Sequence, residues 1–306
     1  MFKHFNTSSS HSFSASSTAD DVSAGLDLSD KTYLITGVNS GLGLESARVL
    51  VQRGARIIGL ARSKEKAEQA LRSIHAQNSI GFACDLSEAK EVQATVESIQ
   101  KQGLKIDSII ANAGIMALPK ATVKYGIELQ FLTNHIGHFI LITGLLTSVT
   151  KDARIVVVAS RAHKRSYREG IQFNNLDAQK EYRAWGAYGQ SKLANILFAK
   201  ALAKRLPAGQ SVYSLHPGVI NTNLMRHLPS PMRSLFSLGG PRWMKSIPQG
   251  AATQVYLAVH PNIPGQSGDY FSDCQPILPN HHGQNTVLAE ELWRHTERLV
   301  EKLLSQ

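Results

Sequence analysis

Apolar residues in this chain of 306 residues gather in short, nearly continuous runs, and longer segments with helical spacing separate these runs. The runs are rich in Val, Ile and Leu, as in strands that are buried on both faces of a sheet. The longer segments carry apolar residues at the spacing of amphipathic helices. We therefore predict six buried strands, at residues 31–36, 55–61, 80–84, 105–112, 153–160 and 210–216.

The alternation of strands and helices predicts an α/β fold. Strands that are separated by helices pair in parallel, and the helices then cover both faces of the sheet. We predict a Rossmann-type doubly wound parallel sheet in a single domain over residues 28–306, with ligands bound beyond the carboxyl ends of the strands. The irregular segment 221–250 reads as an insertion over the sheet edge rather than a second domain.

The first 27 residues differ from the rest of the chain. They are rich in Ser and show no apolar periodicity, so we predict a disordered extension over 1–27. The segment lacks the apolar core of a secretory signal. Its first 25 residues hold one Lys, no Arg and two Asp, a composition that favours a disordered extension over a transit peptide.

Composition narrows the class of protein. The hydrophobic fraction of 42% and the charged fraction of 18% are those of a soluble globular protein. No apolar run approaches the roughly 18 residues that span a bilayer. Cys84 and Cys274 make no disulfide framework, which predicts a reducing, cytoplasmic location. Neither cysteine has metal-ligand spacing with a histidine, and His281 and His282 have no further ligand nearby, so we predict no metal site.

The net charge of +10 is concentrated in one part of the chain. Residues 151–250 hold 16 Lys and Arg against 4 Asp and Glu, a balance of +12, which leaves −2 for the remainder. Such asymmetry indicates an anionic partner, either a phosphorylated cofactor, an acidic membrane surface or nucleic acid. Solvation of helix faces is the alternative explanation of these charges.

A glycine-rich stretch, "TGVNSGLGLE", follows the first predicted strand and opens a helix. Glycines permit a tight turn and a close approach of the backbone to a phosphate, and the helix N-terminus directs free N–H groups toward it. A turn without a ligand is the alternative. We expect dinucleotide contacts from this stretch at Gly37, Asn39, Ser40, Gly41, Leu42 and Gly43.

The spacing Gly-x-x-x-Gly-x-Gly resembles that of the short-chain dehydrogenase/reductase family, and the resemblance extends over roughly residues 28 to 300. The family's other cofactor motifs occur here in the same order, on the predicted elements. The resemblance implies cofactor contacts after the third and fourth strands and around the Pro-Gly motif, at Asp85, Leu86, Asn112, Ala113, Gly114, Pro217, Gly218 and Thr222.

Tyr188 and Lys192 lie four residues apart on one face of a predicted helix. Of the eight tyrosines, Tyr188 alone has a lysine four residues on, and the resemblance makes this pair catalytic. Reduction of a carbonyl needs a proton, and we expect the ammonium to lower the phenol pKa toward the working range. The resemblance adds Ser160, to orient the carbonyl, and Asn134, to hold a relay water. A solvated surface pair is the alternative.

Further motifs are similar to those of the retinol dehydrogenase branch. They are "SRAH", "FNNL" and "AYGQSKLANILF", together with a long segment between Ser160 and Tyr188. The family often has two serines where this chain has Ala159 and Ser160, and the resemblance assigns the role to the second. In this family the segment after the Pro-Gly motif forms a lid, here at about 223–250.

The second strand ends in Ala61 and Arg62, where an acidic residue would select NAD(H). Arg62, helped by Lys64, can bind a 2′-phosphate, so we predict a preference for NADP(H) over NAD(H). A capped, solvated loop is the alternative reading of Arg62.

We therefore expect an NADP(H)-dependent oxidoreductase that interconverts a carbonyl and an alcohol on an apolar small molecule. One alternative is reduction of a C=C bond, as in protochlorophyllide reductase, with the same Tyr and Lys. Another is a non-enzymatic dinucleotide sensor or nucleic-acid-binding protein, which would not need all four catalytic residues. The apolar, basic segment 225–250 could rest on a membrane, and "GHFILITGLLTSV" could pair two copies or pack on its own sheet.

Overall fold

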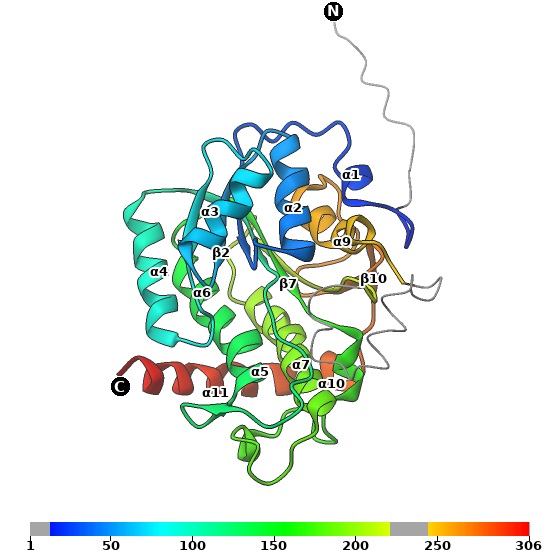
Figure 1. Ribbon diagram of the computed structural model, residues 1–306. Helices are drawn as coiled ribbons and strands as arrows, with labels where there is room; N and C mark the ends of the chain where they lie inside the picture. The colour runs from blue at the N-terminus through cyan, green and yellow to red at the C-terminus, as the bar shows by residue number, and fades with distance from the viewer. Residues whose placement is uncertain (1–12, 221–243, 306) are drawn as a thin grey trace, which may run out of the picture.

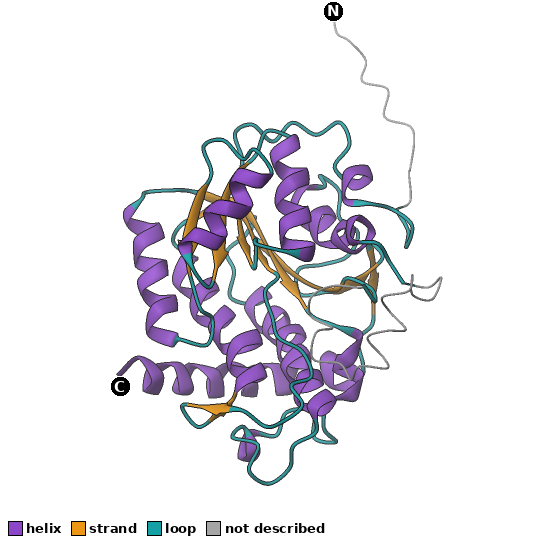
Figure 2. Ribbon diagram, in the orientation of Figure 1, coloured by secondary structure: helices purple, strands orange, loops and turns teal. Residues whose placement is uncertain are grey.

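The computed structural model describes residues 13–220 and 244–305. An eight-stranded sheet forms the centre, in the order β10-β9-β8-β7-β4-β1-β2-β3, with helices on both faces (Figures 1 and 2). Every pairing in this sheet is parallel except that of β9 with β10. The strands are β1 (Thr32–Thr36), β2 (Arg56–Ala61), β3 (Ile80–Ala83), β4 (Ile106–Ala111), β7 (Val149–Val158), β8 (Ser211–His216), β9 (Tyr270–Ser272) and β10 (Gln275–Ile277).

The predicted doubly wound parallel sheet and its six strands are confirmed. β7 begins at Val149, four residues before the predicted start, in a polar stretch. The prediction missed β9 and β10, because each has only three residues and those of β10 are exposed. A short hairpin of β5 (Val123–Lys124) and β6 (Ile127–Glu128) stands outside the sheet.

Helices form one layer on each face of the sheet. One layer consists of α1 (Ala19–Val22), α2 (Gly41–Gln52), α3 (Lys64–Ser73) and α9 (Ile247–Val259). The other consists of α4 (Ala89–Lys101), α6 (Gly137–Leu145), α7 (Ala184–Ala203) and α11 (Thr286–Ser305). The shorter helices are α5 (Leu129–Phe131), the π-helical η1 (Leu132–Ile136), the 3₁₀ turns η2 (Arg161–Arg165) and η3 (Phe173–Asn175), and α10 (His281–Gln284).

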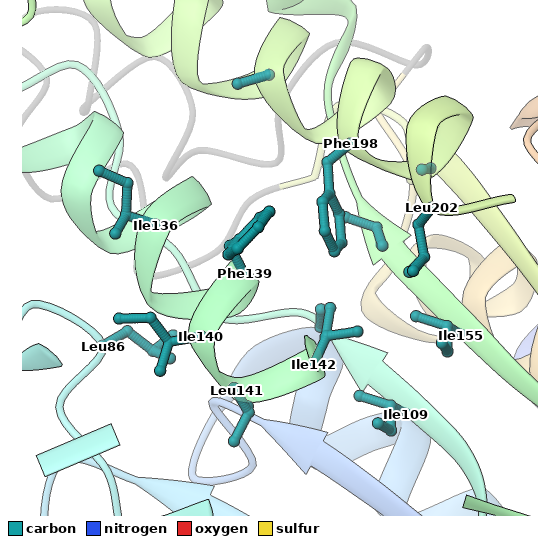
Figure 3. Packing of buried hydrophobic residues seen from close by; sticks show 14 of the residues in the cluster. Leu86, Ile109, Ile136, Phe139, Ile140, Leu141, Ile142, Ile155, Phe198 and Leu202 are labelled. Carbon is teal, nitrogen blue, oxygen red and sulfur yellow. The ribbon is translucent and has the colours of Figure 1, made fainter. Parts of the chain in front are cut away.

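The second layer buries the apolar segment that offered a pairing surface for two copies. In Figure 3 side chains of α6 lie against Phe198 of α7 and against strand residues Ile109 and Ile155. Trp293 of α11 stacks on Phe198 with ring centroids 5.7 Å apart, and it meets Phe139 at 4.9 Å. Helix α11 therefore lies across α6 and α7 and covers them within the chain itself.

Residues 13–27, part of the predicted disordered extension, have a defined structure that packs on the domain. Thr18 and Asp21 form a capping box that starts α1, and Ala19 and Val22 are buried among the residues of α9 and α2. Phe13 packs edge-on against Tyr256, with ring centroids 5.5 Å apart. The few apolar residues of this N-terminal arm, defined as residues 13–27, are too widely spaced to show a periodicity, yet Phe13, Ala19, Val22 and Leu26 pack against the domain. Residues 1–12 lie outside the described part.

Most of the predicted lid at 223–250 also lies outside the described residues, which resume at 244. Ser246 forms a capping box at the start of α9, and residues 247–250 are the first turn of that buried helix.

Candidate active site

A cavity of about 830 Å³ opens at the carboxyl ends of the parallel strands, where a doubly wound sheet binds its ligands. Its walls come from the segments after β1, β2, β3 and β4 on one side and after β7 and β8 on the other. Of the predicted site residues, Gly43 and Asn134 do not line the cavity and Thr222 lies outside the described residues. All the others line it: Gly37, Asn39, Ser40, Gly41, Leu42, Arg62, Asp85, Leu86, Asn112, Ala113, Gly114, Ser160, Tyr188, Lys192, Pro217 and Gly218.

The glycine-rich stretch forms a tight turn from β1 into α2. The N–H of Gly37 donates to the carbonyl of Leu60 at 2.9 Å, which ties the turn to β2. Ser40 is the N-cap residue of α2 and makes no side-chain hydrogen bond to the helix, so it satisfies none of the first-turn N–H groups. A Cβ atom at Gly43 would lie 2.3 Å from the carbonyl oxygen of Gly37. The absence of a side chain at Gly43 therefore allows the close packing of this turn.

The ends of β1 and β4 are joined through Thr36. Its hydroxyl accepts hydrogen bonds from the backbone N–H groups of Asn112 and Ala113, both at 2.9 Å, and Asn112 Nδ2 donates to the Thr36 carbonyl. His138 continues this network. Its Nδ1 lies 3.0 Å from the Asn134 carbonyl and its Nε2 lies 2.9 Å from the Thr36 hydroxyl. Because a carbonyl only accepts, Nδ1 carries the proton and Thr36 donates to Nε2.

Asn134 sits in the π-helical turn η1 and is fully buried. Its Oδ1 accepts from the N–H of Ile115 at 2.8 Å, and its Nδ2 donates to the Ile115 carbonyl and to Ser191 Oγ, both at 2.9 Å. The side-chain amide therefore ties the segment after β4 to α7, directly behind Tyr188 and Lys192.

The predicted pair Tyr188 and Lys192 lies on α7 and faces the cavity, with 6% and 3% of their surfaces exposed. Lys192 Nζ is 5.9 Å from the centre of the Tyr188 ring and donates to the Val158 carbonyl at 2.8 Å. Ser160 follows β7, caps η2 and lines the cavity beside Tyr188. The structure thus brings Ser160, Tyr188 and Lys192 to one wall of the cavity.

Burial dominates the protonation of this pair. It raises the pKa of Tyr188 to about 12, against the smaller, opposing effect of the Ser160 hydroxyl, and it lowers the pKa of Lys192 to about 7. The shift of Tyr188 is opposite to the expected lowering by the lysine. The reason is that both groups are removed from water, which disfavours both charged forms. Tyr188 is therefore protonated at neutral pH.

Two histidines near the site escaped the sequence analysis as functional residues. His163 Nδ1 donates to the Ser160 carbonyl at 2.7 Å, and its Nε2 accepts from the N–H of Asn280 at 3.1 Å. His163 so fixes the turn after Ser160 to the start of α10. His216, at the end of β8, lines the cavity, and its buried Nδ1 has no partner in the described part of the chain. The motifs "SRAH" and "HPG" contain both residues, but neither motif reveals these contacts.

Arg62 and Lys64, the two residues predicted to bind a phosphate, differ in their position relative to the cavity. Arg62 is exposed at the cavity edge after β2 and forms no ion pair within residues 13–220 and 244–305. Lys64 does not line the cavity and pairs instead with Glu68 on α3 at 3.7 Å. Arg62 is therefore the one of the two that can reach a ligand there.

The described residues offer neither a membrane-spanning helix nor a cluster of metal ligands. None of their helices combines the length and the apolar character needed to cross a membrane. They also contain no group of three or more His, Cys, Asp and Glu side chains that could hold a metal ion.

Comparison with known proteins places this architecture. The family described as short chain dehydrogenase matches residues 31–232. Short-chain dehydrogenase TIC 32 B, chloroplastic, from Brassica napus is 39% identical over 305 residues, which cover 95% of each chain. Retinol dehydrogenase 14 from Homo sapiens is 36% identical over 295 residues, which cover 88% of this chain and 86% of that protein.

Solved structures share this fold. An uncharacterized protein from Mycobacterium paratuberculosis has a TM-score of 0.73 at 30% identity and covers 93% of this chain and 97% of its own. A short chain dehydrogenase from Escherichia coli CFT073, solved with NADPH, shares the fold, with a TM-score of 0.63 at 20% identity over 80% of this chain and 97% of its own. The chain therefore belongs to the retinol dehydrogenase-like branch of the short-chain dehydrogenase/reductase family and is an NAD(P)-dependent oxidoreductase.

Proposed function

We propose that the protein uses NADP(H) to interconvert a carbonyl and an alcohol on an apolar small molecule, with Tyr188 as the acid–base group. One observation carries this proposal. Ser160, Tyr188 and Lys192 converge on one wall of a cavity whose far end is the glycine-rich turn. A single ligand stretched along the cavity would meet both.

The glycine-rich turn fits a dinucleotide. The backbone N–H groups of the first turn of α2 are not capped by the Ser40 side chain, so they can donate to a phosphate. The turn is also packed so closely at Gly43 that it leaves no room for a side chain there. When bound, the cofactor would supply or accept the hydride. We assign the pyrophosphate to residues 37–43, the adenine ring to Asp85 and the 2′-phosphate to Arg62. The nicotinamide carboxamide is assigned to Thr222, which follows the Pro217-Gly218 motif in the sequence. Asn112, Ala113 and Gly114 would support the sheet behind the cofactor, and Leu86 would flank the adenine.

The protein's own residues would handle the proton. The Ser160 hydroxyl would orient the carbonyl oxygen, and protonated Tyr188 would donate to the developing alkoxide. Lys192, with a pKa of about 7, can lose and regain a proton near neutral pH and so can restore the Tyr188 proton. We assign Asn134 two roles, to anchor Ile115 and Ser191 and to hold the relay water beside Lys192.

The test of this function is oxidation of NADPH followed at 340 nm with retinal, medium-chain aldehydes, aromatic ketones and quinones. Turnover should fall by roughly a hundredfold or more in Tyr188→Phe, because removal of a general acid costs this much. NADPH binding, measured by fluorescence, should persist in the variant. Tight NADPH binding without turnover of any carbonyl would contradict the proposal. Product analysis distinguishes alcohol formation from reduction of a C=C bond.

The cofactor preference has its own test. Arg62→Ala should reduce the ratio of NADPH to NADH efficiency by roughly tenfold or more, because a charge-assisted contact to the 2′-phosphate is lost. Lys64→Ala is the matched control, since Lys64 pairs with Glu68 away from the cavity. An unchanged ratio in Arg62→Ala would exclude Arg62 as the selecting residue.

We also propose a cellular location and tests of membrane contact and of dimer formation. The free, buried cysteines Cys84 and Cys274 support a reducing compartment such as the cytoplasm. Membrane contact through 225–250 would appear as salt-sensitive co-sedimentation with anionic liposomes. A homodimer would appear as a doubled mass in solution, and its interface would have to lie outside the faces of α6 and α7 that α11 covers.

A further inference from the structure

Three cations line the cavity directly after Ser160. Arg161, Lys164 and Arg165 all belong to η2, all are exposed, and all contribute to the cavity wall. None of them forms an ion pair with an acidic residue of the described chain. The strongly basic segment 151–250 therefore places three uncompensated charges beside the candidate catalytic serine.

These cations lie apart from the proposed phosphate contacts. In the sheet, β7, which leads into η2, is separated by β4 from β1 and by β4 and β1 from β2. At the usual strand spacing this amounts to roughly 10 Å from the glycine-rich turn and roughly 14 Å from Arg62. The η2 cations consequently stand at the end of the cavity that holds Ser160 and Tyr188, where a substrate rather than the cofactor phosphates would lie.

The local structure gives these charges no internal compensation. Side chains three residues apart eclipse in a 3₁₀ turn, so Arg161 and Lys164 stand on the same side and repel each other. Arg161 is also the first residue of η2, where the positive end of the helix dipole disfavours a cation. A bound anion would relieve both effects.

Arg165 has a defined position. Its guanidinium lies 5.1 Å from the centre of the Trp185 ring, and Trp185 meets the ring of Tyr188 edge-on at 6.0 Å. A line of contacts thus connects the cation to the candidate acid–base residue across the cavity wall. The remaining wall is apolar at Ile115, Met116, Leu129, Val219 and Ile220.

We propose that the substrate is an apolar carbonyl or alcohol that bears an anionic group, a carboxylate or a phosphate, and that Arg161, Lys164 and Arg165 bind this group. The proposal rests on the proposed function, because it places the reacting carbon at Ser160 and Tyr188. The 3₁₀ rise separates Arg165 from Ser160 by on the order of 10 Å along the backbone, so an anion at the far end of η2 would be joined to the reacting carbon by a chain of medium length.

The test compares an ω-hydroxy fatty acid of medium chain length with its methyl ester and with the phosphate ester of the corresponding diol. Binding to the NADP⁺-saturated protein is measured by calorimetry in the Tyr188→Phe background, which stops turnover. We expect the acid or the phosphate to bind roughly tenfold more tightly than the methyl ester, because several partly exposed charge pairs add up to this factor. The preference should shrink as salt rises.

The variant Arg161→Gln, Lys164→Gln, Arg165→Gln should bring the affinity ratio of anion to methyl ester close to one. Arg168→Gln is the matched control, an exposed arginine of the same segment outside the cavity wall, and should keep the ratio. Equal binding of anion and ester in the parent would overturn the proposal, as would a preference that survives the triple change. Loss of NADPH affinity in the triple variant would assign the cations to the cofactor instead.

The proposed function fails in a different way. If the anion is preferred and the preference depends on η2, but the protein with Tyr188 intact reduces neither ω-oxo acids nor any carbonyl of the panel, then the anion site stands and the reductase activity does not.

Discussion

Four histidines around the candidate active site are buried, namely His135, His138, His163 and His216. Burial lowers the pKa of each, to about 4 in His138 and to about 3 in His135 and His216. The neutral rings act as fixed hydrogen-bonding groups, with His138 joining Thr36 to Asn134 and His163 holding Ser160. At the residue scale, neutral imidazoles therefore hold the site residues in place and take no part in the proposed proton transfer.

This burial predicts loss of stability in acid. The unfolded chain binds protons at these histidines below a pH of about 6.5, whereas the folded chain does so only near pH 3 to 4, so the free energy of unfolding falls as pH drops through this window. His138→Gln should reduce the difference between urea unfolding at pH 7 and pH 5 by roughly 1–2 kcal/mol. The exposed His75→Gln serves as control, and an unchanged difference in His138→Gln would refute the assignment.

Sequence alone could reach some of these residues and not others. Tyr188 and Lys192 could be predicted as a pair, because a helix places residues four apart on one face. Gly43 could be predicted because its motif joins a strand to a helix. The direction of the pKa shift of Tyr188 could not be predicted from the sequence, since it depends on burial of the side chain by the whole domain. His138 and His163 likewise acquire their partners only through tertiary contacts.

At the scale of elements, the position of α7 against η2 decides whether Tyr188 and Ser160 meet. The two elements approach closely at Gly189, one residue after Tyr188, where an added Cβ atom would lie 2.5 Å from the carbonyl oxygen of Ala162. No flexible side chain intervenes, so the backbone of one element would have to move. The approach of α7 to η2 is a tertiary contact and could not be predicted from the sequence. The strands could be predicted, because their own apolar residues determine that they are buried.

Gly189→Ala should therefore separate α7 from η2. We expect a loss of roughly 1–3 kcal/mol in the free energy of unfolding, as for overpacking elsewhere, and a marked loss of turnover with NADPH binding retained. Gly186→Ala is the control on the same helix, since its Cβ atom would have no neighbour closer than 3.3 Å. Equal effects of the two substitutions would contradict this account.

At the scale of the whole molecule, the N-terminal arm extends the domain beyond the boundary that the sequence indicates. Arg48 on α2 pairs with Asp20 at 2.6 Å, and Gln249 of α9 donates to the Ser16 carbonyl at 3.3 Å. Sequence analysis missed the arm because its stability comes from contacts with α2 and α9 that lie far along the chain, and not from a periodic pattern of its own.

Removal of residues 1–27 should lower the melting temperature, because the surface that Val22 and Phe13 cover would become exposed. Burial of two such side chains contributes about 2–4 kcal/mol, which corresponds to a decrease of several degrees in Tm for a protein of this size. Val22→Ser in the full chain should show part of the same effect. A truncated protein that melts with the full chain would show that the arm adds nothing.

Helix α11 has a consequence for biosynthesis. The last 20 residues of the chain that the structure assigns to a helix, Thr286–Ser305, place Trp293 over Phe139 and Phe198. Because the chain leaves the ribosome from its N-terminus, α6 and α7 emerge before α11, which covers them, has been synthesised. The aromatic faces of α6 and α7 stay open until α11 has also left the ribosome, and until then the nascent protein presents a surface for chaperones.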